Sequence, residues 1–222
     1  MSSHVTYAYI RQNPDIREYI RRADMALAAI GYTEHSFAHV TKVSETAGYI
    51  LETLGFPLEQ IELVKIAGYL HDIGNLVNRI EHSQSGAVMA FRILDKLGME
   101  PAEIATIVTA IGNHDEGTGV PVDAVSAALI LADKSDVRRS RVRNADIASF
   151  DIHDRVNYSV KESQLRINEA KTLVKLKLAI DTRYSSVMDY FEIFLERMLM
   201  CRRAAEMLGC SFKLKANGSK VL

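Results

Sequence analysis

The sequence has few cysteines and contains no long apolar run. Its 222 residues include only Cys201 and Cys210, which are too few and too close to the C-terminus to form a disulfide framework. No stretch approaches the ~18 consecutive apolar residues that a membrane span needs. The N-terminus shows no basic start followed by an apolar run, so it does not read as a secretory signal. We therefore expect free thiols in a reducing, cytoplasmic compartment and no membrane partner.

The chain also lacks an excess of charge of either sign. The formal net charge is -1, and nothing in this balance indicates nucleic acid or an acidic membrane as a partner. Hydrophobic residues make up 48% and charged residues 25%, which is ordinary for a globular protein with a buried core. The length allows one large domain, or a domain of roughly 150 residues followed by a smaller one.

Apolar residues recur at helical spacing through the first two-thirds of the chain. Glycine and proline mark the ends of these segments, as at Gly55, Gly74 and Gly98, and Pro14 and Pro101 stand where helices begin. The spacing predicts six helices, over about residues 14–31, 36–54, 58–72, 83–97, 101–114 and 123–137.

The pattern changes after residue 149. Apolar residues alternate with polar ones from Val156 to Ile167 and from Val174 to Ile180, which predicts two strands. A long amphipathic helix over about 185–208 follows, and Phe212 and Leu214 predict a last strand before an Asn217-Gly218 hairpin turn. We therefore predict a mainly α fold, with a helical domain over residues 1–148 and a small C-terminal α+β unit over residues 149–222.

Histidines and aspartates stand at the ends or in the interiors of the predicted helices. Imidazole and carboxylate ligands suit Mn, Fe, Ni, Co, Zn or Mg ions. Two such ions about 3.5–4 Å apart would hold a phosphoryl group and deprotonate a water to form the nucleophile. The candidate ligands are His39, His71, Asp72, His82, His114 and Asp133.

The His-Asp dipeptide by itself is weak evidence for such a site. It occurs three times, at His71-Asp72, His114-Asp115 and His153-Asp154. We interpret the last pair as solvated or as a helix cap, because it has no supporting neighbours. A single helix histidine such as His39 is also more often a packed residue than a metal ligand.

The order of these residues resembles the HD superfamily of metal-dependent phosphohydrolases, whose defining pattern is a His, a His-Asp pair and a distant Asp, all on helices. Here the pattern reads His39, His71-Asp72 and Asp133, and the resemblance covers about residues 35–140. It implies an HD-type helical domain, one or two divalent metal ions, and hydrolysis of a phosphate ester or anhydride by a metal-bound hydroxide.

Two further positions resemble the binuclear members of this superfamily. His82 and His114 stand where the HD-GYP phosphodiesterases and the bacterial diadenosine tetraphosphatases have ligands for a second ion, which would share Asp72. Asn75 stands where HD-GYP proteins usually carry lysine, and Gly119-Val120-Pro121 replaces their Gly-Tyr-Pro element. The layout is closer to the diadenosine-tetraphosphatase type, which implies a nucleotide or a dinucleoside polyphosphate as substrate.

Basic residues follow Asp133 closely. On a continuous helix Lys134, Arg138 and Arg141 would partly share its face, so Lys134 and Arg138 are candidates to neutralise the developing charge of a phosphate. The alternative is a solvated helix end where cations meet the negative dipole. Asp115 and Glu116 are candidates to orient the water, or exposed loop acids.

Three functions remain open at this point. The first is the phosphohydrolase, in which Asp72, Lys134 and Arg138 act on a small phosphorylated substrate. The second is a sensor module that binds metal and nucleotide without turnover. The third is nucleic-acid binding by a C-terminal basic face with Lys175 and Lys177, which the net charge disfavours. For the C-terminal unit we expect a role in homodimer formation or in covering the mouth of the site.

Overall fold

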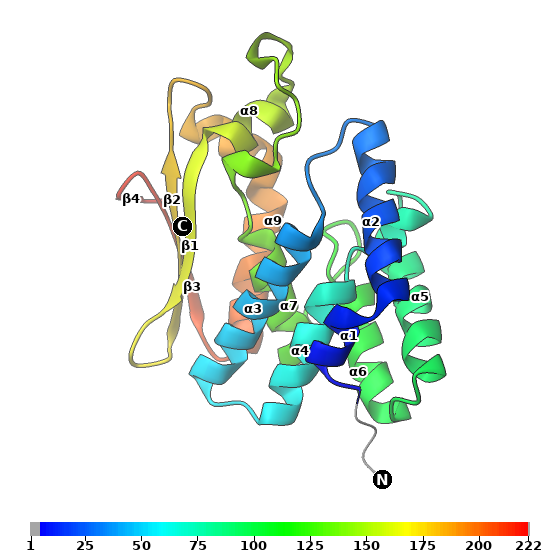
Figure 1. The fold of residues 1–222 in the computed structure, drawn as a ribbon. Helices are drawn as coiled ribbons and strands as arrows, with labels where there is room; N and C mark the ends of the chain where they lie inside the picture. The colour runs from blue at the N-terminus through cyan, green and yellow to red at the C-terminus, as the bar shows by residue number, and fades with distance from the viewer. Residues whose placement is uncertain (1–4, 222) are drawn as a thin grey trace.

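Helices form most of the chain up to residue 159, and a small sheet follows (Figure 1). The computed structural model describes residues 5–221. This confirms the mainly α fold with a small sheet at the C-terminal end. The α-helices of the described chain are α1 Tyr7–Gln12, α2 Pro14–Ala29, α3 Phe37–Leu54, α4 Leu58–Leu70, α5 His82–Lys96, α6 Pro101–Gly112, α7 Ala124–Lys134, α8 Ile152–Ser159 and α9 Val187–Met207.

Local sequence signals set most of the helix ends. The side chain of Asn13 caps α2, with Pro14 as its first residue, and Ser36 caps α3 in the same way. Gly55 ends α3 with a φ of 90°, a left-handed conformation in which a side chain would be strained. Asp123 begins α7 with a reciprocal capping box to Ser126. These caps explain why the predicted boundaries lie close to the observed ones.

The first predicted strand was wrong over residues 156–159, which belong to helix α8. The side chain of Asp151 accepts a hydrogen bond from the backbone N–H of Asp154 and so starts a helix. Val156 and Val160 are four residues apart and both are fully buried. Val156 and Tyr158 alternate with Asn157 and Ser159, so the last turn of α8 resembled a strand, and β1 starts only at Val160.

Helix α7 ends three residues earlier than the spacing predicted. Lys134 is its last residue, and a short 3-10 turn, Arg139–Arg141, follows the loop after it. The argument that Arg138 and Arg141 share a helix face with Asp133 was therefore wrong. Both arginines lie on the loop that follows α7, and both contact Glu34, just before the start of α3.

Four strands form one sheet in the order β1-β2-β3-β4. Strands β1 and β2 are antiparallel, whereas β2 and β3 are parallel because α9 crosses over between them. The predicted Asn217-Gly218 turn is confirmed: both residues have positive φ, and they join β3 to β4. The strands are β1 Val160–Ile167, β2 Leu173–Ile180, β3 Ser211–Ala216 and β4 Ser219–Lys220.

Helix α9 lies between the sheet and helix α7 (Figure 1). Its buried side chains, among them Tyr190, Phe194 and Met198, belong to the same hydrophobic core as the inner face of the sheet and as α3, α4 and α7. The core thus continues across residue 149, and the division there into two units stays a prediction. In residues 5–221 none of the helices has both the length and the apolarity to cross a bilayer.

Candidate metal centre

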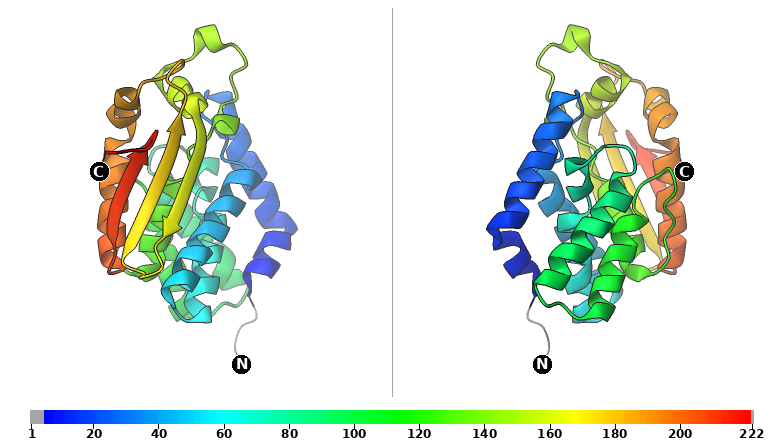
Figure 2. Two further views of the ribbon diagram at one scale, coloured as in Figure 1. Left: turned by 90° about the vertical axis from the view of Figure 1, so that its left-hand side faces the viewer. Right: turned by 90° about the vertical axis from the view of Figure 1, so that its right-hand side faces the viewer.

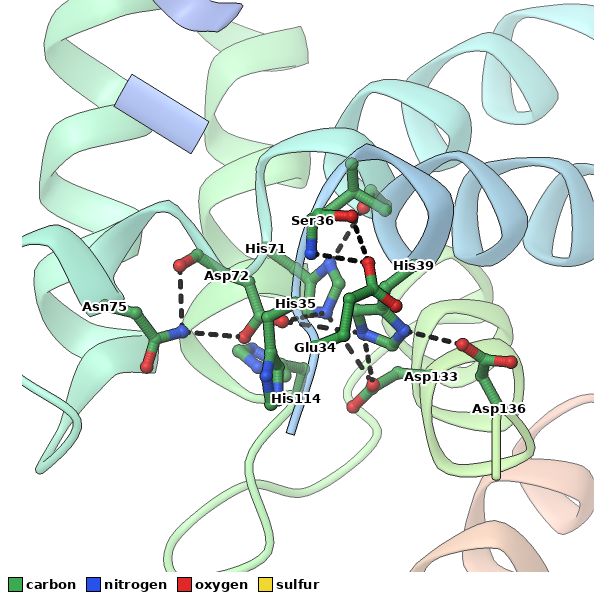
Figure 3. A network of polar contacts seen from close by, with 12 residues as sticks. Glu34, His35, Ser36, His39, His71, Asp72, Asn75, His114, Asp133 and Asp136 are labelled. Carbon is green, nitrogen blue, oxygen red and sulfur yellow. Dashed lines mark hydrogen bonds and ion pairs between the residues drawn. The ribbon is translucent and has the colours of Figure 1, made fainter. Parts of the chain in front are cut away.

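Six candidate ligands from five separate chain segments come together at one place, and Figure 3 labels all of them except His82. They stand within α3, directly after α4, at the start of α5, directly after α6 and near the end of α7. Five of the six are buried, and Asp133 is partly buried. The residues are His39, His71, Asp72, His82, His114 and Asp133.

Asp72 points its two carboxylate oxygens at different histidines. Its Oδ2 atom lies 3.5 Å from His39 Nε2 and 3.2 Å from His71 Nε2. Its Oδ1 atom lies 3.5 Å from His82 Nε2, which in turn is 3.2 Å from His114 Nε2. One carboxylate therefore joins two groups of imidazoles, which is the arrangement required to bridge two cations.

Asp133 completes the first of these groups. Its Oδ1 atom lies 3.3 Å from His39 Nε2 and 3.6 Å from His71 Nε2. Nitrogen and oxygen ligands that each lie about 2.1 Å from one ion are roughly 3–3.5 Å apart from each other. The spacing of these side chains therefore suits a single small cation.

Each of the four histidines uses Nδ1 for a hydrogen bond and turns Nε2 toward the cluster. His71 donates to the carbonyl of Gly68, His82 to that of Arg79, and His114 to that of Ile111, at 2.8, 3.1 and 2.6 Å. His39 donates to Oδ2 of Asp136 at 2.8 Å. A proton held on Nδ1 leaves a lone pair on Nε2, and this is the tautomer that ligates metals.

Three buried atoms at the centre have no hydrogen-bond partner among the described residues. They are His39 Nε2, His71 Nε2 and Asp72 Oδ2. Leaving such groups unsatisfied costs about 1–3 kcal/mol each, and more when they are charged. A divalent cation would satisfy all three at once, so the residues fit a bound metal ion.

The charges of the cluster also favour a cation. Burial opposes ionisation of Asp72, but its contacts with His71 and His39 hold the pKa of this carboxyl well below its usual range. Burial likewise opposes ionisation of Asp133, and the ammonium group of Lys134 and the two imidazoles outweigh it, so this pKa is also lowered. Both carboxylates are therefore charged and available as ligands at neutral pH.

The histidines of the cluster differ in the direction in which their pKa is shifted. Burial lowers the pKa of His114 well below its usual value and also lowers the pKa of His82. Burial opposes protonation of His71 as well, but Asp72 and Asp133 outweigh it and raise its pKa to about 10. A metal ion bound by Nε2 of His71 would compete with protonation of this histidine, so metal binding should release a proton.

A glycine contact explains why the chain turns sharply after Asp72. A Cβ atom on Gly74 would lie 1.9 Å from the carbonyl oxygen of His82 and 2.4 Å from the backbone nitrogen of Gly86. The turn Ile73–Leu76 therefore packs directly against the start of α5. This contact places His82 beside Asp72.

Lys134 lies in the site but is fully engaged by acids. Its Nζ atom is 2.7 Å from Asp133 Oδ2 and 3.1 Å from Glu116 Oε2, and Glu116 also pairs with Arg197 of α9. Burial opposes the charge of Lys134, yet Asp133 and Glu116 raise its pKa. Glu116 is therefore a partly buried partner of two cations and not an exposed loop acid.

Arg138 does not line the pocket beside the cluster. Its guanidinium group contacts Glu34 at 3.3 Å and Asp136 at 3.0 Å on the outer side of His39. Arg141 is buried and donates to the backbone carbonyls of Glu34 and Asp136, and it does line the pocket. The two arginines point in different directions because α7 ends at Lys134 and neither arginine belongs to this helix.

A pocket of about 370 Å³ opens directly from the cluster. Asp72, His82, His114 and Asp133 form its floor, and its walls come from the loop after α2, from α8 and from α9. The walls include residues that the sequence did not single out, and no local motif marks them. They are Tyr32, Thr33, His35, Arg79, Asp151, Asn157, Phe194 and Arg197.

His153 and Asp154 also line this pocket. His153 is exposed, and Asp154 contributes its backbone N–H to the cap of α8, as expected for a solvated or capping pair. The dipeptide alone did not predict that these two residues line the pocket.

Asp136 is the residue of this centre that sequence analysis missed. It is 1% exposed and contacts His39, Lys42 and Arg138. It stands three residues after Asp133, and no motif in the sequence marks it. Its role becomes visible only from its hydrogen bond to His39 in the structure.

Comparison with known proteins agrees with this geometry. The family model described as HD domain matches residues 36–192. The chain is 24% identical over 191 residues to the uncharacterized protein MJ1020 of Methanocaldococcus jannaschii, covering 75% of this chain and 73% of that protein. It is 25% identical over 138 residues to Ribonuclease Y of Latilactobacillus sakei, covering 62% of this chain but only 24% of that protein.

A solved structure is also similar. It is the crystal structure of a predicted HD superfamily hydrolase from an uncultured Thermotogales bacterium, with 24% identity, a TM-score of 0.44, and coverage of 56% of this chain and 67% of that chain. The family model covers well over half of the sequence and includes all six residues of the cluster. The chain belongs to the HD domain family, and its fold supports metal-dependent phosphohydrolase activity in general.

Proposed function

We propose that this protein hydrolyses a phosphate ester or anhydride of a small molecule, with one or two divalent metal ions bound by the six-residue cluster. The observation that carries this proposal is the position of Asp72, whose two oxygens face two different groups of histidines. His39, His71, Asp72 and Asp133 would hold one ion, and Asp72, His82 and His114 the other.

Divalent ions held by these residues would supply a nucleophilic water at neutral pH and would neutralise charge on the phosphoryl oxygens. The protein's own groups then hold the ligands in place. Asn75 donates to Asp72 Oδ1 at 3.0 Å, and the Nδ1 hydrogen bonds fix the ring orientation of the histidines. Asp115, whose Oδ1 is 3.9 Å from His82 Nε2, is placed to accept a proton from a water in the pocket.

Arg79 is the cation best placed to bind a phosphate. Its guanidinium lies 3.3 Å from His82 Nε2 and 3.4 Å from Asn75 Oδ1, and no carboxylate of the described chain pairs with it. Arg197 also faces the pocket, although Glu116 shares its charge. Guanidinium groups bind phosphate oxygens in a bidentate manner, so Arg79 and Arg197 would orient the scissile group.

Lys134 takes a different role from the one that its sequence position implied. It is held between Asp133 and Glu116, so its main effect on the reaction would be to orient Asp133. Arg138 contacts Glu34 and Asp136 and has no direct route to the substrate. We therefore assign phosphate binding to Arg79 and Arg197 in place of Arg138.

For the rest of the substrate we propose a nucleotide or dinucleoside polyphosphate. Tyr32 is 43% exposed at the pocket wall, and the guanidinium of Arg79 lies 5.5 Å from the centre of its ring. An exposed aromatic ring next to a phosphate-binding arginine suits a base that stacks while its phosphates reach the metal ions. The cavity of about 370 Å³ is in the size range of small-molecule sites.

The alternative is a sensor that binds metal and nucleotide without turnover. The two functions differ in one measurement, the release of phosphate or nucleoside from a panel of substrates with Mn, Co or Ni. The panel should contain generic phosphate esters, nucleoside mono- and triphosphates, diadenosine polyphosphates, and a short RNA, because a related protein is named Ribonuclease Y.

The decisive experiment combines this panel with metal analysis of the purified protein. We expect His71→Ala and Asp72→Ala to lose metal and turnover together. His153→Ala serves as the matched control for metal content, since this exposed histidine belongs to no ligand group of the described chain. Turnover that survives both His71→Ala and Asp72→Ala would end the metal-hydrolase proposal, whereas metal binding without any turnover would favour the sensor.

A further inference from the structure

The outer face of the sheet carries an unusual concentration of positive charge. Alternate residues of the strands point inward, where Val174, Leu176 and Leu214 are fully buried. The residues between them point outward. We call the outward basic residues the basic face; they are Arg166, Lys175, Lys177, Lys213, Lys215 and Lys220.

The strand register sets these cations side by side. Arg166 of β1 is paired with Lys175 of β2, and Lys175 with Lys213 of β3. Two residues further along, Lys177 is paired with Lys215, and Lys215 with Lys220 of β4. Neighbouring strands are about 4.8 Å apart and successive outward residues about 6.7 Å apart, so the six charges occupy a small area.

No acid of the described chain neutralises this basic face. None of its six side chains forms an ion pair or a side-chain hydrogen bond within residues 5–221. The one acidic side chain on the outward positions of these strands is Glu162, which lines a surface hollow with Lys177 and Lys215 but forms an ion pair with neither. Like charges directly opposite each other on a sheet destabilise it, so their accumulation here calls for an anionic partner.

The basic face is open and lies away from the catalytic pocket. Figure 2 (left) shows β1, β2 and β3 in front, with no helix across them. Helix α9 covers the opposite side of the sheet and separates it from α7, which carries Asp133. A ligand on the basic face would therefore leave the metal cluster accessible.

We propose that the basic face binds the phosphate backbone of a double-stranded nucleic acid without reading its sequence. A duplex carries one negative charge per about 1.7 Å of its axis, which matches a dense group of cations. The face has no aromatic side chain on which single-stranded bases could stack, so a duplex fits it better than a single strand. A second copy of the same face is excluded as occupant, because the two surfaces would repel each other.

An anionic membrane is the other polyanion that a flat basic surface can meet. No large apolar side chain of β1, β2, β3 or β4 is exposed on this face, so it offers charge alone and nothing to insert among lipid chains. Charge without an apolar or lipid anchor gives weaker and less durable attachment. The structure thus favours nucleic acid, and vesicles serve as the competing ligand in the test.

The test is fluorescence anisotropy of labelled DNA and RNA duplexes with the full chain, from about 50 to about 200 mM salt. Each phosphate contact contributes about 0.9 to the slope of log affinity against log salt. The double variant Lys175→Gln/Lys213→Gln should reduce this slope by about 1.8 and weaken binding by about tenfold to a hundredfold near 0.1 M salt. A second pair, Lys177→Gln/Lys215→Gln, should do the same.

The matched control is Arg202→Gln/Arg203→Gln, which removes the same charge from two exposed positions of α9 outside the basic face. It should keep at least most of the affinity and of the salt slope. The proposal is overturned if the wild-type chain does not bind either duplex at about 50 mM salt, or if all three double variants lose affinity equally. Binding to phosphatidylserine vesicles with none to duplexes would overturn it in favour of a membrane.

This inference does not rest on the phosphohydrolase activity. Turnover of a generic phosphate ester should be the same in the wild type and in the lysine variants, because the basic face is separated from the pocket by α9 and α7. An inactive protein that still binds duplexes would refute the proposed function and leave the basic face intact.

Discussion

The Nδ1 atom of His39 lies 2.8 Å from Oδ2 of Asp136, and this hydrogen bond connects the loop after α7 to the metal cluster. Asp136 is buried, and Lys42 and Arg138 contact its other oxygen at 2.8 and 3.0 Å. Burial opposes its ionisation, but the hydrogen bond from His39 and the nearby cations lower its pKa. A charged carboxylate thus fixes the proton of His39 on Nδ1 and its lone pair on Nε2.

We predict that Asp136→Asn weakens metal binding, although Asp136 is not itself one of the six candidate ligands. An amide can still accept from His39, but it lacks the negative charge that makes the imidazole a better ligand. Loss of such a partner costs on the order of tenfold to a hundredfold in metal affinity or activity. Metal titration followed by calorimetry measures the change, and Asp95→Asn at an exposed position of α5 is the control. An unchanged affinity in Asp136→Asn would show that Asp136 has no influence on the cluster.

Removing divalent metal should lower the thermal stability of the wild-type protein. Without an ion, three buried polar atoms of His39, His71 and Asp72 have no hydrogen-bond partner in the described structure. Saturation at 100 times the dissociation constant stabilises the folded state by about 2.7 kcal/mol, or roughly 5–10 °C in Tm for a chain of this size. Calorimetric scans before and after chelation, with Mn added back, measure the shift. His71→Ala should show almost no metal-dependent shift, and equal shifts in both proteins would contradict the site.

Gly74→Ala should disrupt the turn that places His82 beside Asp72. The new Cβ would meet backbone atoms of His82 and Gly86 at 1.9 and 2.4 Å, and backbone cannot move aside as a side chain can. We expect a loss of about 1–3 kcal/mol in the free energy of unfolding, together with loss of the second metal ion. Denaturant unfolding and metal stoichiometry check this.

The control for this prediction is Gly112→Ala in α6. Its Cβ would meet the Cβ of Ala87 at 3.7 Å and Oε1 of Gln84 at 4.0 Å, which are ordinary contacts, and alanine is a better helix former than glycine. Gly112→Ala should leave stability unchanged or raise it slightly. Equal losses in the two variants would indicate a general sensitivity to added volume and not a specific contact at Gly74.

Lys134→Met should destabilise the fold more than the same substitution at an exposed lysine does. Its ammonium group is buried between Asp133 and Glu116, and methionine would leave Asp133 without this cation and Glu116 with Arg197 alone. Breaking a buried ion pair in this way costs about 3–5 kcal/mol. Urea unfolding measures the loss, and the exposed Lys96→Met is the control. Adding Glu116→Gln to Lys134→Met should recover part of the stability, and a double variant no more stable than the single one would contradict the ion-pair explanation.

Part of the ligand set was accessible from local signals in the sequence, whereas His39 and Asp133 were identified through the family pattern. His71-Asp72 precedes a glycine turn, His82 begins a helix, and His114 follows one. The family pattern connected these positions, and the structure brings all six together. Helix spacing also predicted most of the helices, since apolar periodicity and caps are properties of neighbouring residues.

The errors arose where a local pattern had two readings. Residues 156–159 fit either a strand or one helical turn, and the cap at Asp151 decided for the helix. Arg138 was placed in the site by extending α7 beyond Lys134, but the chain leaves the helix there. In each case periodicity over a few residues did not determine where the element ends.

The sequence by itself determined which residues are able to ligate metal and where most of the helices lie, because these depend on side-chain chemistry and on contacts a few residues apart. Only the tertiary structure decided that Asp136 orients His39, that Arg79 and Arg197 reach the pocket, and that Lys213 lies beside Lys175. These pairs are far apart in the chain, and they meet through helix packing and through the parallel pairing of β2 with β3. The net charge of -1 averages over the whole surface, so it concealed a face on which six cations stand together.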